Sequence, residues 1–229
     1  MKRSGQLFLN LYIIVAIIHI FSLVQMNENI SMISKFILIP MLMLHVYSNS
    51  RNELSLNRPL LFALFFCWIG DVMLVFVPLN ENFFLIGLAA FLIGHIFYII
   101  SFRKYVVSKK TLMQRKPWMV IPAIIYSAGV IIILFPYLEE MMVPVILYSV
   151  AITFMAITAL NRFDRTYLYS FIFVLCGAIF FMISDTLIAI NKFYMPVDYG
   201  TLLIMLTYIT AQFLITTGLV LHLKYNSAS

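Results

Sequence analysis

The sequence predicts an all-α integral membrane protein with eight transmembrane helices. Hydrophobic residues make up 63% of the 229 residues and charged residues only 10%, whereas a soluble domain carries about 25% charged residues. Eight apolar runs are long enough to cross the hydrocarbon core, which takes about 20 helical residues. The charges between these runs alternate from one side to the other. Almost nothing remains for a soluble domain, so residues 1–229 are predicted to form a single membrane domain.

The limits of the apolar runs define the predicted spans. The first run is longer than the hydrophobic region of a signal peptide and no A-x-A-like site follows it, so we expect an uncleaved span. Pro122 and Pro144 fall in early helical turns, where proline is tolerated, and no span is predicted to be broken in its middle by Gly and Pro. In chain order the spans are Leu7–Met26, Ile30–Tyr47, Pro59–Pro78, Phe83–Phe102, Trp118–Leu138, Met141–Leu160, Leu168–Ile190 and Tyr199–Leu223.

The loop charges predict the orientation. By the positive-inside rule the more basic side is the cytoplasm, so both termini are predicted to be cytoplasmic. The opposite side carries Glu28, Glu81, Glu139, Glu140 and Asp198, with Lys192 as its only base. Thirteen of the fifteen basic residues share the cytoplasmic side: Lys2, Arg3, Arg51, Arg58, Arg103, Lys104, Lys109, Lys110, Arg115, Lys116, Arg162, Arg165 and Lys224.

The net charge of +6 therefore follows the membrane topology, which argues against a nucleic-acid partner. The longest connection, residues 103–118, holds six of the basic residues. It is predicted to lie on anionic headgroups, with a docking site for a protein partner as the alternative.

A short internal similarity links the third and seventh spans. Residues 70–74 (GDVML) and 184–188 (SDTLI) both place a small residue and an aspartate near the outer end of a helix. Two four-helix halves in the same orientation would produce this similarity, as parallel repeats do in other membrane proteins. The sequence therefore suggests a 4+4 parallel repeat.

Several polar residues lie deep inside the spans. Asp71 falls in the stretch FFCWIGDVMLVF, which holds no other charge. A carboxylate within the bilayer costs roughly 2.5–3.5 kcal/mol on insertion scales, so such residues usually have a function. Counting about 1.5 Å per residue places polar groups from six spans roughly 8–20 Å below the outer boundary. They are Lys35, Asp71, His95, Tyr148, Asp185, Tyr208 and Gln212, with His19 as a further candidate.

Two interpretations of this layer stay open. In the structural one, Lys35 pairs with an aspartate and His95 bonds a backbone carbonyl; a structural role is also favoured for His19, His45 and His222, which lie in the first span or near helix ends. In the functional one, two acids at one depth share a polar pocket in which one carboxyl is protonated while the other is ionised. That asymmetry suits acid/base catalysis.

Other catalytic sites have less support. The sequence contains no G-x-S-x-G nucleophile motif. Cys67 and Cys176 lie inside apolar runs without a C-x-x-C pair and are predicted to be small core residues. One central His and two acids are a weak case for a metal site, so we expect neither a metal nor a cofactor.

The pattern is similar to the YhhN family of multi-pass membrane proteins, which includes the lysoplasmalogenases. The similarity extends from about Lys35 to Gln212. Two departures are Ile188, where Leu is expected, and Phe36, where Pro often follows the lysine. The matching segments are Gly70-Asp71-x-x-Leu74, Phe83-x-x-Gly87-x-x-x-Phe91-x-x-Gly94-His95-x-x-Tyr98, Gly177-Ala178-x-x-Phe181-x-x-Ser184-Asp185-x-x-Ile188-Ala189-x-x-Lys192-Phe193 and Tyr208-x-x-x-Gln212.

This resemblance implies eight helices and hydrolysis of the vinyl ether bond of a lysoplasmalogen, a single-chain lysophospholipid. It places Asp71, His95 and Asp185 at catalytic positions. Either aspartate can be the general acid, with the other as electrostatic partner. Lys35, Tyr148, Lys192, Tyr208 and Gln212 are the implied substrate-binding residues.

The alternative function is a transporter or binding protein for a small solute, a proton or a lipid that uses the same acids. The absence of a span broken by Gly and Pro, and the displacement of the polar layer toward one face, argue against it. The basic loops favour a bacterial inner (cytoplasmic) membrane.

Overall fold

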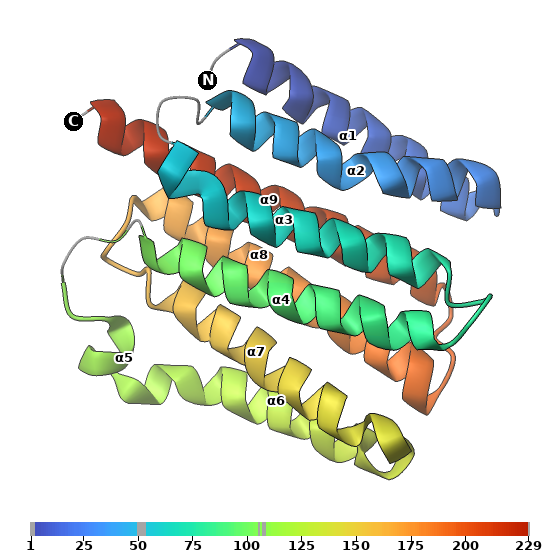
Figure 1. Ribbon diagram of the computed structural model, residues 1–229. Coiled ribbons are helices and arrows are strands. Elements are labelled where there is room, and N and C mark those ends of the chain that lie inside the picture. The colour runs from blue at the N-terminus through green and yellow to red at the C-terminus, as the bar shows by residue number, and fades with distance from the viewer. Residues whose placement is uncertain (1–2, 50–53, 105, 107–108, 229) are drawn as a thin grey trace. The chain divides into compact units, whose positions relative to one another are not determined.

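The computed structural model describes residues 3–49, 54–104, 106 and 109–228, and it places the side chains of these residues except 54–56 and 223–228. Within these residues eight helices are long and apolar enough to cross a membrane, which confirms the predicted all-α membrane fold (Figure 1). The spans are Arg3–Val24, Glu28–Asn49, Asn57–Val75, Asn82–Lys104, Pro117–Tyr137, Glu139–Leu160, Leu168–Tyr194 and Gly200–His222. Of the charges that predict the orientation, Lys2, Arg51 and the side chain of Lys224 lie outside the described residues.

The chain divides into two compact units, Met1–Ser101 and Phe102–Ser229. Unit 1 holds α1 (Arg3–Val24), α2 (Glu28–Asn49), α3 (Leu54–Val75) and all but the last turn of α4 (Asn82–Lys104). Unit 2 holds the short α5 (Leu112–Arg115), then α6 (Ile121–Leu134), α7 (Met142–Leu160), α8 (Leu168–Ala189) and α9 (Gly200–Ala228). Each unit therefore has four spanning helices, as the predicted repeat requires; duplication itself stays a prediction.

Histidines join α1 to α2 in unit 1. Near one end of the pair, His19 Nδ1 lies 2.8 Å from Ser34 Oγ. Near the other end, His45 Nδ1 lies 2.7 Å from the Gly5 carbonyl oxygen. Both histidines are fully buried, and each satisfies a polar group that lipid could not solvate. In unit 2, His222 Nδ1 accepts from the Tyr167 amide at 3.3 Å.

Small residues let α3 approach α4. A Cβ added at Gly70 would lie 2.6 Å from the Phe91 ring, and one at Gly94 would lie 3.0 Å from Cys67 Sγ. Close backbone approach at small residues is the usual way that membrane helices associate. The glycine directly before Asp71 therefore lies at the contact between α3 and α4.

Pro40 lies in the middle of α2 and is not among the prolines weighed from the sequence. Proline has no amide hydrogen, so the carbonyl of Phe36 loses its normal helical donor. The Trp68 indole of α3 replaces that donor, with Nε1 2.9 Å from the Phe36 carbonyl oxygen. The helix consequently continues through Pro40, and the prediction of an unbroken span holds for this helix despite the overlooked proline.

Helices α8 and α9 pack closely in unit 2. A Cβ at Gly177 would lie 2.7 Å from Ile215 and 3.0 Å from the Ala211 carbonyl oxygen. One turn before the end of α8, Ser184 Oγ donates to the Ile204 carbonyl of α9 at 3.1 Å. As in unit 1, the small residue that precedes the aspartate lies at a helix contact.

The basic connection and the α7–α8 turn form contacts that the sequence alone does not reveal. The connection, residues 103–118, contains α5, and Arg115 of α5 forms a 3.1 Å ion pair with Asp164 of the turn; its position on the headgroups stays a prediction. Arg162 lies in the turn, as predicted, and is fully buried. Its guanidinium donates to the Phe102 carbonyl and to Ser170 Oγ, both at 3.0 Å. A planar group with five donors suits this bridging position.

Candidate functional site

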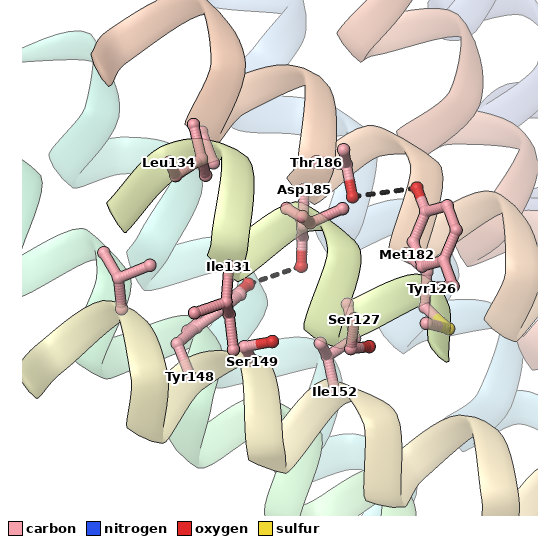
Figure 2. A pocket seen from close by; sticks show the side chains of 13 residues that line it. Tyr126, Ser127, Ile131, Leu134, Tyr148, Ser149, Ile152, Met182, Asp185 and Thr186 are labelled. Carbon is pink, nitrogen blue, oxygen red and sulfur yellow. Dashed lines mark hydrogen bonds between the residues drawn. The ribbon is translucent and has the colours of Figure 1, made fainter. Parts of the chain in front are cut away.

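A pocket opens between α6, α7 and α8 of unit 2, with an empty volume of about 430 Å³ that is partly open to the surroundings (Figure 2). Its walls are mainly aliphatic, but one carboxylate and several hydroxyl groups line it. The lining residues are Tyr126, Ser127, Val130, Ile131, Leu134, Val145, Tyr148, Ser149, Ile152, Met182, Asp185, Thr186 and Ala189.

Asp185 and Tyr148 meet in this pocket. The Tyr148 hydroxyl donates to Asp185 Oδ2 at 2.5 Å, a short distance typical of a hydrogen bond to a carboxylate. Tyr148 is only 8% exposed and Asp185 is half-buried. Tyr148 lies near the start of α7 and Asp185 near the end of α8, so antiparallel helices bring the two to the same level.

Two further hydroxyl pairs hold α6 against this site. The Tyr126 hydroxyl donates to Thr186 Oγ1 at 2.9 Å, and Ser127 Oγ lies 2.5 Å from Thr153 Oγ1. Tyr126 and Thr186 are not among the site residues predicted from the sequence. The position of Thr186 directly after Asp185 was the one available signal, because pairing between helices cannot be read from a single span.

Three of the predicted residues of unit 2 do not line the pocket. Lys192 is exposed on a π-helical turn (Ile190–Tyr194) that follows α8. Tyr208, 3% exposed, packs its ring edge-on against Phe181 with centroids 5.5 Å apart. Gln212, also on α9, is fully buried. The residues that surround Asp185 in the pocket therefore come from α6, α7 and α8.

The predicted residues of unit 1 lie on α2, α3 and α4. Asp71 is 3% exposed and lies within electrostatic reach of Tyr12, a 1% exposed residue of α1 that the sequence analysis missed. His95 of α4 is fully buried. Lys35 is half-buried and lies within electrostatic reach of His19.

No group of three or more His, Cys, Asp or Glu side chains that could hold a metal ion occurs among the described residues. The polar groups of the pocket are one carboxylate and several hydroxyls. A half-buried carboxylate with a hydroxyl donor can accept a proton, orient water or stabilise a nearby cation.

The family model and the similar proteins of known name point to the same family. The model of the YhhN family matches residues 30–219. Human lysoplasmalogenase TMEM86A is 31% identical over 162 residues, which cover 69% of this chain and 63% of that protein. A Mycobacterium bovis protein named lysoplasmalogenase is 30% identical over 165 residues, 71% of this chain and 60% of its own. The chain thus spans about three fifths of these curated relatives. No solved structure matches.

Proposed function

This chain belongs to the YhhN family, and on that premise we propose that it is a membrane-embedded hydrolase that cleaves the vinyl ether bond of a lysoplasmalogen. Its products would be a fatty aldehyde and the glycerophospho-headgroup. The proposal is supported by the names of the related human and mycobacterial proteins. It is also supported by an intramembrane carboxylate in a pocket, held by a tyrosine hydroxyl.

The proposed reaction needs one acid, one anion and one water molecule. Protonation of the vinyl ether at its β-carbon makes an oxocarbenium ion. Water adds to the carbon that bears the oxygen and gives a proton to the carboxylate that donated the first one, which leaves a neutral hemiacetal and restores the acid. The hemiacetal then loses a proton from its hydroxyl group, and its bond to the glycerol oxygen breaks as that oxygen gains a proton. A carboxylic acid that donates and a carboxylate that stabilises the cation supply these steps, as in glycoside hydrolysis.

In this proposal one of Asp71 and Asp185 is the general acid and the other is the electrostatic partner that orients water. The observation that carries it is the hydrogen bond from Tyr148 to Asp185 within the pocket. This bond holds Asp185 Oδ2 in place. Because the carboxylate is planar and rigid, it also restricts the direction of Oδ1. His95 and the tyrosines Tyr148 and Tyr208 would orient these groups or the water. Gln212 would contact the lipid, and Lys35 or Lys192 would bind the phosphate.

The proposed location is the cytoplasmic membrane of a bacterium, with both termini in the cytoplasm. Thirteen basic residues on one predicted side support this orientation. The partners in the proposal are the lysophospholipid and the bilayer. Protein partners are not part of it.

Aldehyde release by the purified protein tests the proposal. The substrates are a lysoplasmenyl-ethanolamine and the saturated alkyl-ether and acyl lysolipids of the same length. We expect release from the vinyl ether alone, lost in Asp71→Asn and Asp185→Asn and kept in Asp198→Asn, whose carboxylate is exposed in a loop. Cleavage of no lipid by a well-folded protein would instead favour transport or lipid binding, and the acids would then be tested as a proton relay in liposomes.

A further inference from the structure

One side of the pocket lies between α6 and α8. Within the described residues, α6 packs closely against α7 but not against α8. The side chain of Tyr126 extends from α6 toward α8, where its hydroxyl donates to Thr186 Oγ1 (Figure 2). Only 11% of the span that contains α6 is buried, against 39–50% for the other three spans of unit 2. The pocket therefore borders a gap between α6 and α8, and a tyrosine crosses this gap.

This side of the pocket faces the hydrocarbon core of the bilayer. Tyr126 lies next to the midpoint of its span, Pro117–Tyr137, and is 40% exposed. The midpoint of a spanning helix is surrounded by lipid chains. A molecule that reaches the pocket between α6 and α8 therefore comes from within the bilayer.

Gly129 leaves open space beside Tyr126. It follows Tyr126 by three residues on α6 and so lies on the same side of the helix. A Cβ added at Gly129 would have no described atom within 4 Å, whereas at each of the other seven glycines it would meet an atom within 3.4 Å. Close packing therefore does not explain this glycine, which destabilises the interior of a helix relative to alanine.

The pocket is shorter than a lipid chain. Its lining runs along α6 from Tyr126 to Leu134, which is roughly 12 Å of helix. On α8, Asp185 lies between the two ends of the lining, Met182 and Ala189. A chain that spans one leaflet is about 15 Å long, half of the hydrocarbon core. A lipid whose polar end is held at Asp185 therefore leaves part of its chain outside the pocket.

We propose that the gap between α6 and α8, beside Gly129 and Tyr126, admits a single-chain lipid from the bilayer and then holds the part of its chain that leaves the pocket. The inference rests on the proposed function and assigns the route of its substrate. The exchange costs little, because lipid chains are as apolar as the side chains of Val130 and Met182 that line the pocket. Bulk added at residue 129 should exclude the chain while Asp185 itself is unchanged.

Photolabelling of α7 tests this route without hydrolysis. A saturated alkyl lysolipid, which lacks the vinyl ether bond, carries a diazirine near the polar end of its chain and labels the full-length protein in phosphatidylcholine nanodiscs. Mass spectrometry then locates the labelled residues. Ile152 lines the pocket and is 6% exposed, whereas Val150 is 60% exposed and lies outside the lining. The ratio of label on Ile152 to label on Val150 compares lipid inside the pocket with lipid outside it.

Gly129→Leu should lower this ratio at least about fivefold, because extra methylenes in an occupied space are costly. Gly129→Ala should keep the wild-type ratio, since a Cβ has room there. Ala128→Leu is the matched control: Ala128 is exposed and, two residues after Tyr126, lies on a different side of α6, so it should also keep the ratio. Gly129→Leu should unfold at a higher temperature than the wild type, because leucine is the better helix former.

Several results would overturn the route. They are an unlabelled Ile152 in the wild type, an unchanged ratio in Gly129→Leu, and an equal fall in Ala128→Leu. A lower unfolding temperature in Gly129→Leu would contradict the open space beside residue 129, on which the route depends.

Aldehyde release by the same preparation separates this inference from the proposed function. A protein that hydrolyses the vinyl ether but whose labelling ratio is unchanged in Gly129→Leu refutes the route alone. One whose ratio falls in this variant, but which releases no aldehyde as the wild type, keeps the route and refutes the hydrolase.

Discussion

At the scale of single residues, the Tyr148–Asp185 contact is the best-defined polar interaction of the candidate site. A charged side chain in a membrane span costs roughly 2.5–3.5 kcal/mol, and a hydrogen bond to a charged group returns about 1.5–3 kcal/mol. The Tyr148 hydroxyl at 2.5 Å therefore offsets much of the cost of keeping Asp185 within the span. It also fixes which way the carboxylate points.

Replacing Tyr148 by Phe should lower turnover with little change in KM. The variant keeps the ring but removes the donor to Asp185, and the loss of such a bond corresponds to about a 10- to 100-fold fall in kcat. The measurement is the initial rate of aldehyde release over a range of lysoplasmenyl-ethanolamine concentrations.

Tyr137→Phe is the matched control, because the Tyr137 ring packs against Tyr194 in the same unit and lies outside the pocket lining. It should retain wild-type kcat. Full turnover in Tyr148→Phe would show that the orientation of Asp185 does not depend on this hydroxyl.

At the scale of elements, α2 depends on a donor from its neighbour. Pro40 cannot donate to the Phe36 carbonyl, and the Trp68 indole does so at 2.9 Å. Lipid offers no replacement for a missing backbone partner. The bond between α2 and α3 is therefore part of what keeps α2 helical through its middle.

A double-mutant cycle isolates this bond. Trp68→Phe should destabilise the protein, and in a Pro40→Ala background, where residue 40 regains an amide for Phe36, the same change should cost about 1 kcal/mol less. The free energy of unfolding in bicelles titrated with a denaturing detergent measures both steps. Trp118, 61% exposed, serves as control: Trp118→Phe should cost the same in both backgrounds. Equal costs for Trp68→Phe would mean that the indole does not compensate for the proline.

Span positions were predictable because the length and polarity of a bilayer-crossing segment are set by the bilayer itself. The details within and between spans depend on packing. Examples are Pro40 with its donor from another helix, the burial of Arg162, and the docking of α5 through Arg115 and Asp164. The loop charges predicted the side of the membrane for Arg115 and Arg162 but not the groups that they contact.

For the candidate site, too, the positions of residues along each helix were predictable, whereas their partners on other helices were not. An aspartate within an apolar run is visible without a structure, and counting along the helices placed Tyr148 and Asp185 at one level. Tyr126 and Tyr12 escaped notice because tyrosine is common in membrane helices, and only a neighbouring helix reveals its partner. The bond of Thr186 away from its own helix likewise depends on α6.

At the scale of the whole molecule, the two units share an internal arrangement. In each unit the third spanning helix carries the aspartate. The small residue directly before this aspartate contacts the fourth spanning helix. Gly70 lies against Phe91 of α4, and Ser184 bonds the Ile204 carbonyl of α9. Such correspondence is what a parallel repeat would produce, and it gives each unit one acid for the proposed reaction.

If both acids serve one reaction, their losses should not multiply. General acid–base groups contribute about 10²- to 10⁴-fold to turnover, so Asp71→Asn and Asp185→Asn should each lower kcat by at least about 10²-fold. Residues that act as a unit give strongly non-additive effects, and the double variant should therefore be about as slow as the slower single variant. Single-turnover aldehyde release, with enzyme in excess over lipid, measures all three.

A double variant whose loss equals the product of the two single losses would indicate independent roles, because removing one acid would leave the contribution of the other intact. In that case each aspartate would contribute to turnover separately, and the proposed cooperation of a general acid with an electrostatic partner in one reaction would be wrong.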